Sequence, residues 1–573
     1  MKIKHLFGLA VIAAMTASCS SNEDLGTAGP GTGTNETGVG YATFTINLPS
    51  VSGTRAADAG GAEMDEGTAN EYAVKSATAL IFQKYGSDEG SCKFVESVDL
   101  PTAAADWTDD TTIGITTTKK LVAKLTNVDT KNQYYVLVLL NNNKKTGGVK
   151  VALPTVGQSY NEWNSQILTP SVDDLAADND FYMANAPLKG TASPTTLVTI
   201  NKENIYSSKE KAEAGTSAAT VYVERGVAKM SVTDPTTKTV IDKATNNPTK
   251  STVEFNNWAL DITNRKTYAV HNIDDLSTDF PDIWTTPRFI GTNSRVYWGK
   301  DPNYNLDNLN TGKEAEREKE FNFIKATSGI NKTFTESAYC LENTFNLANM
   351  YQGQTTRVIF KATYTPKDDA GNPLAEQDGT FYTIGNMTNI LNEAALKTAV
   401  NTAATSVLPG CTVDYTNLKQ EGSHVITLAD IKDSTGTTLV ADKVYIGKTG
   451  TEIVKEINDK LGLTDGAGHA EAMVGINTYA RGVTYYIARV KHFGSLTPWN
   501  SGESYGTDNG KYLGRYGMLR NNWYELTVGN VYGPGYPGVP PVDPNQPDDE
   551  NEKYLSVSVK ILSWAKRSDT VDL

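Results

Sequence analysis

The sequence is poor in the residues on which disulfide frameworks, metal sites and many active sites depend. Its 573 residues include only four cysteines and five histidines. After Cys19 the remaining cysteines are Cys92, Cys340 and Cys411, an odd number at spacings that match no metal motif. They allow one disulfide, such as Cys340 with Cys411, or three buried free thiols. No histidine pair has metal-ligand spacing, so the sequence predicts neither a metal nor another cofactor.

Positive charge is also scarce. The chain has 52 lysines and arginines against 66 acidic residues, a net charge of −14, which argues against nucleic acid as a partner. Motifs for catalysis are missing or incomplete. The stretch Gly447–Thr449 resembles the end of a P-loop, but Asp442 stands where its first glycine is needed. An alternation of Asp and Asn over 301–307 has Leu306 where a calcium loop needs glycine. We therefore predict no enzymatic activity.

The N-terminus predicts an exported lipoprotein. Lys2 and Lys4 precede a short apolar stretch over 6–14, and small residues then lead to Cys19. The apolar stretch is too short to span a membrane, and this arrangement is typical of a signal peptide. The residues before Cys19 resemble a bacterial lipobox, which implies cleavage after residue 18 and lipid attachment at Cys19. The precursor is therefore expected at the cell outer membrane, held there by its lipid.

The rest of the chain has the composition of an all-β protein. Its 28 tyrosines and many threonines suit pleated surfaces, and abundant Asn and Gly suit tight turns. Tyr134–Leu140 lacks apolar–polar alternation, which predicts a central strand buried on both faces. Few helices are expected. The clearest is Glu452–Leu461, with a capping box from Thr449 and a stop at Gly462. A second helix is predicted over Leu391–Val400.

Two strands at opposite ends of the chain share one pattern. The first spans 41–48, and its apolar face consists of Ala42, Phe44, Ile46 and Leu48. The second follows a Pro/Gly-rich, acidic segment over 531–553, which predicts an extended spacer outside the core. Its apolar residues are Leu555, Val557, Val559 and Ile561, with Trp564 beyond them. A lone strand is not stable in water, so it must pair within its own domain or with another molecule.

A loop after the first strand contains Arg55–Ala56 among small and acidic residues, where proteolysis is expected. A cut there by an Arg-specific protease would release the lipid, the tether and the first strand together. Loss of that strand would leave an unpaired sheet edge beside an apolar slot. A C-terminal strand from another copy could fill the slot, and repetition of this head-to-tail contact gives a fibre.

Several stretches, in this order along the chain, resemble Bacteroidetes-type fimbrillins, the type V pilus subunits, and especially the major subunit of short fimbriae. They are 135–141, 181–183, 222–229, 258–260 with Tyr268, 339–344, 356–358 and 520–524, followed by the Pro-rich segment. The resemblance implies two transthyretin-like Greek-key β-sandwich domains with few short helices. It also implies cleavage between Arg55 and Ala56 and a donor strand within 554–573.

The resulting prediction divides the chain into five parts. They are a signal peptide (1–18), a lipid-tagged propeptide (19–55), an N-terminal sandwich (56–225), a C-terminal sandwich (226–530), and a linker with the donor strand (531–573). The predicted function is a structural pilus subunit that polymerises by donor-strand exchange and supports adhesion from a cell-surface fimbrium. Tip and anchor fimbrial subunits are expected as further partners. The alternatives are a tip or anchor subunit, a surface glycan-binding lipoprotein, and a lipoprotein hydrolase.

Overall fold

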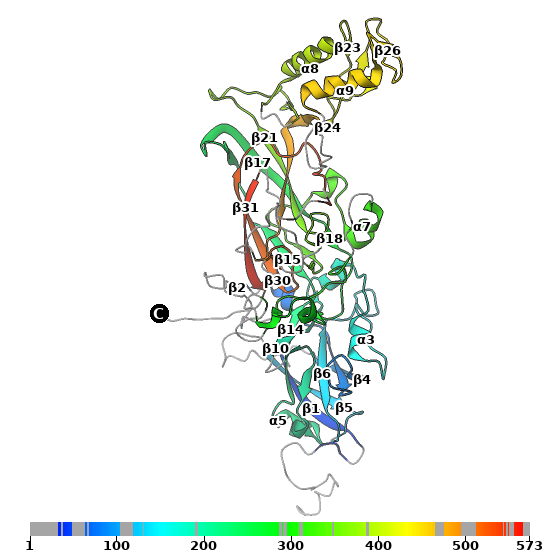
Figure 1. Cartoon of the computed structure of the whole chain (residues 1–573). Helices are drawn as coiled ribbons and strands as arrows, with labels where there is room; N and C mark the ends of the chain where they lie inside the picture. The colour runs from blue at the N-terminus through cyan, green and yellow to red at the C-terminus, as the bar shows by residue number, and fades with distance from the viewer. Residues whose placement is uncertain are drawn as a thin grey trace, which may run out of the picture.

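The computed structural model describes most of the chain from residue 33 onward. The described ranges are 33–35, 38–48, 64–65, 68–102, 118–129, 131–189, 193–285, 289, 295–306, 309, 313–346, 349–385, 389–463, 475–493, 512–542, 544–545, 548 and 555–564. These residues form a mostly β, elongated molecule (Figure 1). Two nine-stranded sheets lie one after the other along its length, and a smaller helical unit lies at one end.

The first sheet, named here the N-terminal sheet, has the strand order β13-β1-β14-β9-β6-β3-β4, with β5 paired to β1 and β12 paired to β6. Its strands are β1 (Gly40–Asn47), β3 (Ala77–Gln83), β4 (Lys93–Leu100), β5 (Thr118–Leu125), β6 (Tyr134–Leu140), β9 (Met183–Asn185), β12 (Val198–Ile200), β13 (Ile205–Tyr206) and β14 (Ala219–Arg225). The predicted central strand is β6, which pairs with β3, β9 and β12. Val136–Leu140 are all buried, as the lack of alternation predicted.

The second sheet, named here the C-terminal sheet, has the order β2-β31-β30-β16-β17-β21-β29, with β15 paired to β20 and β30. Its strands are β2 (Met64–Asp65), β15 (Ala228–Val232), β16 (Lys238–Ile241), β17 (Pro248–Asp261), β20 (Ala338–Cys340), β21 (Arg357–Thr365), β29 (Val483–Arg489), β30 (Asn522–Val531) and β31 (Leu555–Trp564). Its core is rich in aromatic residues, among them Trp258, Phe360 and Tyr524. The chain passes from the N-terminal to the C-terminal sheet between Arg225 and Ala228.

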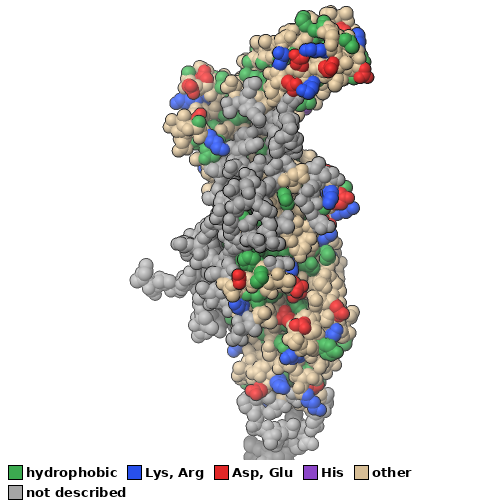
Figure 2. All heavy atoms as spheres, viewed as in Figure 1, with side chains coloured by type: hydrophobic (Ala, Val, Ile, Leu, Met, Phe, Trp, Pro, Cys, Tyr) green, Lys and Arg blue, Asp and Glu red, His purple; other side chains and the backbone are tan. Residues whose placement is uncertain are grey.

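A third unit, named here the distal unit, is inserted between β21 and β29 and has its own apolar core. It contains α8 (Glu393–Val407), α9 (Gly450–Leu461), β22 (Phe381–Ile384), β23 (Thr412–Val413), β24 (Gly422–His424), β25 (Ile431–Lys432), β26 (Val444–Tyr445), β27 (Lys448–Thr449) and β28 (Ile476–Tyr479). Figure 1 places α8 and α9 at the opposite end of the molecule from β1. Figure 2 shows basic and acidic side chains next to one another on this unit.

Both predicted helices are present. The Thr449 hydroxyl oxygen accepts the Glu452 amide, the Glu452 carboxylate accepts the Thr449 amide, and Gly462 ends α9 with φ 68°. The second helix differs from its prediction. It begins only after Asn392, whose side chain caps it, and it continues to Val407. The sequence pattern therefore located the helices, but the prediction did not recognise that they form a separate unit.

The remaining elements are short. They are α2 (Ala69–Tyr72), α3 (Tyr160–Asn164), α4 (Val172–Leu175), α5 (Lys209–Ala214), α6 (Leu276–Asp279), α7 (Glu314–Glu320), β7 (Ala176–Ala177), β8 (Asp180–Phe181), β10 (Leu188–Lys189), β11 (Pro194–Thr195), β18 (Thr263–Asn264) and β19 (Phe321–Asn322). Among the described residues, no helix is long and apolar enough to cross a membrane. The alternative of a disulfide between Cys340 and Cys411 is wrong, because Cys92, Cys340 and Cys411 are all free and buried.

Buried polar groups join the two sheets at α2. The Glu71 carboxylate lies 2.9 Å from Lys229 Nζ and accepts the Tyr339 hydroxyl at 2.5 Å. Lys229 Nζ also lies 3.6 Å from the centre of the Trp523 ring. Arg225 Nε donates to the Glu71 carbonyl at 2.8 Å. Because a buried charge without a partner is costly, this network fixes how the N-terminal sheet sits on the C-terminal sheet.

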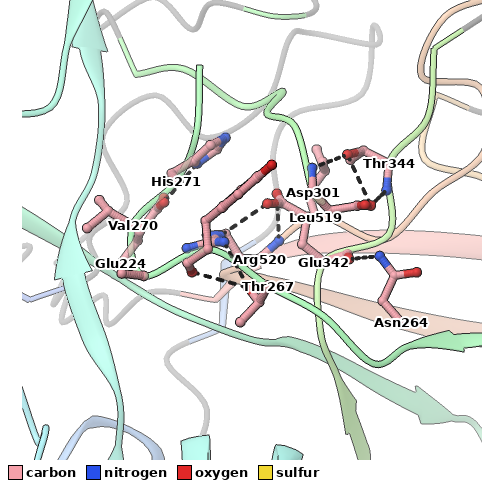
Figure 3. Close-up of polar contacts among 12 residues, drawn as sticks. Glu224, Asn264, Thr267, Val270, His271, Asp301, Glu342, Thr344, Leu519 and Arg520 are labelled. Carbon is pink, nitrogen blue, oxygen red and sulfur yellow. Dashed lines mark hydrogen bonds and ion pairs between the residues drawn. The ribbon is translucent and has the colours of Figure 1, made fainter. Parts of the chain in front are cut away.

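A second buried cluster lies beside this joint (Figure 3). His271 Nδ1 lies 2.8 Å from one Glu224 carboxylate oxygen, and Arg295 lies 2.8 Å from the other. Arg520 Nε lies 3.2 Å from the Glu342 carboxylate. Glu224 belongs to β14 of the N-terminal sheet, whereas the residues facing it follow β17 in the chain. The cluster therefore adds a second polar connection between the two halves of the molecule.

Candidate strand-exchange site

The predicted first strand, β1, lies inside the N-terminal sheet and has neighbours on both sides. It pairs antiparallel with β5 along its whole length, from Gly40 opposite Leu125 to Asn47 opposite Thr118. It also pairs parallel with β14, where Phe44 to Asn47 lie opposite Ala219 to Tyr222. Ala42, Phe44 and Ile46 are fully buried and Leu48 is buried, so all four residues of the predicted apolar face enter the core.

The opposite face of β1 is also covered. The Thr43 hydroxyl donates to the carbonyl of Ala212 in α5 at 2.6 Å. The hydroxyl oxygens of Thr45 and Ser217 lie 2.6 Å apart. Alternation identified only the apolar face of this strand, and it could not reveal the short helix that covers the other face. Removal of β1 would therefore uncover apolar core, the backbone of β5 and β14, and two polar partners, the Ala212 carbonyl on α5 and the Ser217 hydroxyl that follows it.

The predicted C-terminal strand, β31, pairs within its own chain. It runs antiparallel to β30 from Leu555 opposite Val531 to Ser563 opposite Asn522. Within the described ranges, its other edge meets β2 at two positions, where Met64 and Asp65 lie opposite Ser563 and Trp564. In the chain on its own, the strand thus takes the intramolecular pairing. The side chains of Leu555, Val557, Val559, Ile561 and Trp564 lie outside the described residues.

The predicted lipidation and cleavage residues cannot be placed in the fold. Cys19, Arg55 and Ala56 lie outside the described residues. The two described segments that flank the cleavage position are β1 and β2. They belong to different sheets, since β1 pairs with β5 and β14 whereas β2 pairs with β31. In the sequence, Arg55 therefore lies between β1, which is buried in one sheet, and β2, which pairs with the C-terminal strand β31 in the other.

A sequence comparison places this C-terminal region in a known family. Residues 477–570, which run from β28 through β31, match the family described as major fimbrial subunit protein type IV, fimbrillin, C-terminal. This match identifies the C-terminal region of the chain as a fimbrillin C-terminal region. A comparison with curated proteins finds no significant match.

The solved structures that resemble this chain share little sequence with it. A candidate cell adhesion protein from Parabacteroides distasonis is 10% identical, with 91% of this chain and 97% of that chain covered and a TM-score of 0.36. The tip fimbrial protein Mfa3 from Porphyromonas gingivalis is 11% identical, with 91% and 100% covered and a TM-score of 0.31. A fimbrial assembly protein from Parabacteroides distasonis is 13% identical, with 61% and 93% covered and a TM-score of 0.27. With TM-scores this low, these likenesses carry no further argument.

The linker before the C-terminal strand differs from its prediction. An extended spacer outside the core was expected over 531–553, but Val531 and Tyr536 are buried and belong to apolar clusters. Asp548 is fully buried as well. A Pro/Gly-rich composition favours an extended backbone. It does not indicate which part of the fold that backbone packs against. The prediction that this segment stays outside the core is therefore wrong for these residues.

The alternating Asp/Asn stretch near residue 301 has a structural role. The Asp301 carboxylate accepts the backbone amides of Asn303 and Thr344, each at 2.5 Å. Burial raises the pKa of Asp301 to about 7, although these amide donors favour the charged form. Within the described ranges, no group of three His, Cys, Asp or Glu residues is arranged to hold a metal ion. Asp301 thus holds two segments of backbone together through its two oxygens.

Proposed function

We propose that the whole chain is a fimbrillin and the stalk subunit of a type V pilus. It is exported as a lipoprotein on Cys19, cleaved after Arg55 and polymerised by donor-strand exchange. The observation that carries this proposal is the contrast between β1 and β31. A strand that is buried and paired on both sides lies on the far side of Arg55 from the rest of the chain. A strand with a similar apolar alternation lies next to the edge of its sheet, flanked on its outer side by the two residues of β2, where it can leave without crossing the core.

The energetics favour exchange once β1 is free to leave. Burial of the four apolar side chains of β1 contributes on the order of 8 kcal/mol, at about 2 kcal/mol each, before any backbone hydrogen bonds are counted. An incoming strand gives up its pairing with β30 and gains partners on two sides, β5 and β14. While β1 occupies the slot, the incoming strand has no place to bind. Cleavage after Arg55 removes the covalent link that keeps β1 at its own site.

The positions of donor and acceptor predict a fibre. The acceptor slot belongs to the N-terminal sheet and the donor to the C-terminal sheet, and Figure 1 shows β1 and β31 well separated along the molecule. A contact between two different surfaces of the same subunit repeats head to tail and does not close. We propose that each sheet folds on itself as a transthyretin-like Greek-key sandwich. In support, β14 pairs with β1 through its first half and with β9 through its second half.

The test is polymerisation of residues 20–573 before and after treatment with an Arg-specific protease. Mass spectrometry should locate a cut after Arg55, and a native gel should then show a ladder of oligomers. Arg55→Gln should stay uncut at this position and monomeric, whereas Arg265→Gln, a matched change at an exposed arginine, should leave the ladder unchanged. Deletion of 554–573 should abolish the ladder. A chain that is cut after Arg55 and stays monomeric would contradict the stalk role and favour the glycan-binding lipoprotein.

A further inference from the structure

The connection between β30 and β31 is much longer than the geometry requires. The last residue of β30, Val531, lies opposite the first residue of β31, Leu555. Neighbouring antiparallel strands can be joined by two residues. Here the chain instead leaves the sheet after Val531 and returns to it at Leu555. Connections of this length without secondary structure of their own usually serve a function.

Three tyrosines fix the first part of this connection. The Tyr486 hydroxyl donates to the Gly533 carbonyl and the Tyr479 hydroxyl to the Gly535 carbonyl, both at 2.9 Å. The backbones of Tyr485 and Tyr536 exchange two hydrogen bonds, at 2.9 and 2.7 Å. Gly535 allows this close approach, because a Cβ atom there would lie 2.0 Å from the Tyr485 carbonyl oxygen. The segment thus adds a short extended partner to β29.

Arg357, at the start of β21, holds the middle of the connection. Its Nη2 donates to the Pro540 carbonyl at 2.7 Å and its Nη1 to the Pro541 carbonyl at 3.0 Å. Its Nε lies 2.8 Å from the Asp261 carboxylate, which aims the guanidinium at the linker. The side chain is only 3% exposed. The planar fork of arginine can bind two neighbouring carbonyls at once, and a lysine cannot reproduce that arrangement.

The last anchor is Asp548. Its side chain is fully buried, its amide donates to the Met350 carbonyl at 3.2 Å, and its carboxylate accepts the Thr355 hydroxyl at 3.3 Å. The connection is therefore held at its start, middle and end. We call residues 533–548 the strap; its described residues are 533–542, 544, 545 and 548.

We propose that the strap stays bound to its own subunit when the C-terminal strand is donated, with Arg357 as the residue that positions it. This inference rests on the proposed function. Six residues, 549–554, then separate the last anchor from the donor strand, and they reach about 20 Å when extended. A fully released linker over 532–554 would reach about 80 Å. The strap therefore limits where the neighbouring subunit can dock. It also gives every contact between successive subunits of the fibre a similar geometry.

Hydrogen exchange measured by mass spectrometry tests the proposal on the whole chain, residues 20–573. Peptides that cover 533–548 should be equally protected in the uncut monomer and in the polymer formed after cleavage. Exchange in these peptides that is tenfold faster in the polymer would overturn the proposal. Absence of any polymer would instead contradict the proposed function, so the two failures are distinguishable.

The variant Arg357→Lys tests the positioning role. It keeps a positive charge beside Asp261 but loses the paired donors to Pro540 and Pro541. We expect tenfold faster exchange around residues 538–542, and fibres whose persistence length, measured by electron microscopy, falls at least twofold. Arg265→Lys, an exposed matched change, should alter neither. Fibres that stay equally stiff with a loosened strap would overturn the positioning role.

A milder variant keeps the test valid if Arg357→Lys fails to fold. Thr355→Val removes the hydroxyl, which lies 3.3 Å from the Asp548 carboxylate and 2.9 Å from the Tyr351 carbonyl, and preserves the shape of the side chain. We expect faster exchange at the end of the strap, in peptides that contain Asp548, together with a smaller decrease in fibre stiffness. Unchanged stiffness with faster exchange would again contradict the proposal.

Discussion

The first and last strands of the molecule carry a similar sequence pattern but occupy opposite environments. β1 and β31 both alternate apolar and polar residues. β1 lies between β5 and β14, whereas β31, among the described residues, is paired along its length with β30 and at two positions with β2. Alternation thus indicates which side chains share a face, but the number of neighbouring strands is set by the tertiary fold. That number decides whether a strand can leave without loss of its domain.

The contrast predicts a large difference between the two strand deletions. Removal of residues 20–48 uncovers the core of the N-terminal sheet, so we expect no folded monomer, because the open slot must be filled by the C-terminal strand of another copy. Removal of 554–573 takes away a strand that is paired along its length on one side, so we expect a folded monomer with both apolar cores intact. Circular dichroism and size-exclusion chromatography would compare the two chains. If the second deletion also prevents folding, β31 is an obligatory part of the C-terminal sheet and the contrast with β1 fails.

A single substitution in β1 tests the same contrast more finely. Phe44 is fully buried, and Phe44→Ala should lower the free energy of unfolding of the N-terminal sheet by about 3–5 kcal/mol. Tyr85→Ala is the control, because Tyr85 is 63% exposed and its loss should cost less than about 0.5 kcal/mol. Denaturant unfolding of residues 20–573 measures both. Equal effects would mean that β1 contributes little to its domain.

The local features were predictable from the sequence because they depend on nearby residues. The capping box at Thr449, the glycine stop at Gly462 and the buried strand Tyr134–Leu140 each follow from a short pattern. The apolar face of β1 follows from alternation in the same way. The position of β31 in the sheet depends on its pairing with β30. No pattern within the C-terminal segment reveals that pairing.

The long-range contacts could not be predicted, since they join residues that are distant in sequence. Arg357 binds carbonyl groups of Pro540 and Pro541, and backbone carbonyls give no residue-type signal. Glu71 reads as one of many acidic residues in a polar stretch, yet it is buried against Lys229 and Tyr339. The distal unit has the same difficulty, because its helices were recognisable but their shared core was not.

The joint at Glu71 decides whether damage to β1 stays within the N-terminal sheet. Glu71→Gln leaves Lys229 buried without its ion pair, so we expect a loss of about 3 kcal/mol in the free energy of unfolding. The N-terminal sheet should then unfold separately from the C-terminal sheet, in a calorimetric trace with two resolved transitions. Glu213→Gln, in an exposed pair with Lys209, should change stability by less than about 0.5 kcal/mol.

The same joint predicts a pH dependence. Burial opposes ionisation of Glu71, but Lys229, the Tyr339 hydroxyl and the Thr68 amide outweigh it and hold the pKa of Glu71 below its usual value of 4.5. The unfolded chain therefore binds this proton more readily than the folded chain. The stability contributed by Glu71 is present above pH 4.5 and is lost as the pH falls through the lower folded pKa. Stability of Glu71→Gln should fall less steeply over this acidic range; an unchanged slope would contradict the assignment.

The smallest predicted effect lies in the distal unit, far from both strands. Ile446 and Gly447 form the two-residue turn between β26 and β27, with φ 45° and 84°. A β-branched residue is strained at positive φ, whereas asparagine is favoured in such turns. Ile446→Asn should therefore stabilise the unit by about 0.5–1 kcal/mol, measured as a rise in its melting temperature. Val444→Asn should give no such gain, because Val444 is equally exposed but lies in a strand.

The substitution Ile446→Asn also tests whether the exchange of β1 for β31 is sufficient for polymerisation. Ile446 is 67% exposed at the end of the molecule opposite β1, so its replacement changes an apolar surface without touching either strand. If exchange of strands is sufficient, Ile446→Asn should polymerise after cleavage at the rate of the parent chain. A slower rate would show that the distal unit contacts the neighbouring subunit. The substitution relieves backbone strain in its own turn and touches neither β1 nor β31, so it cannot slow exchange through the two strands themselves.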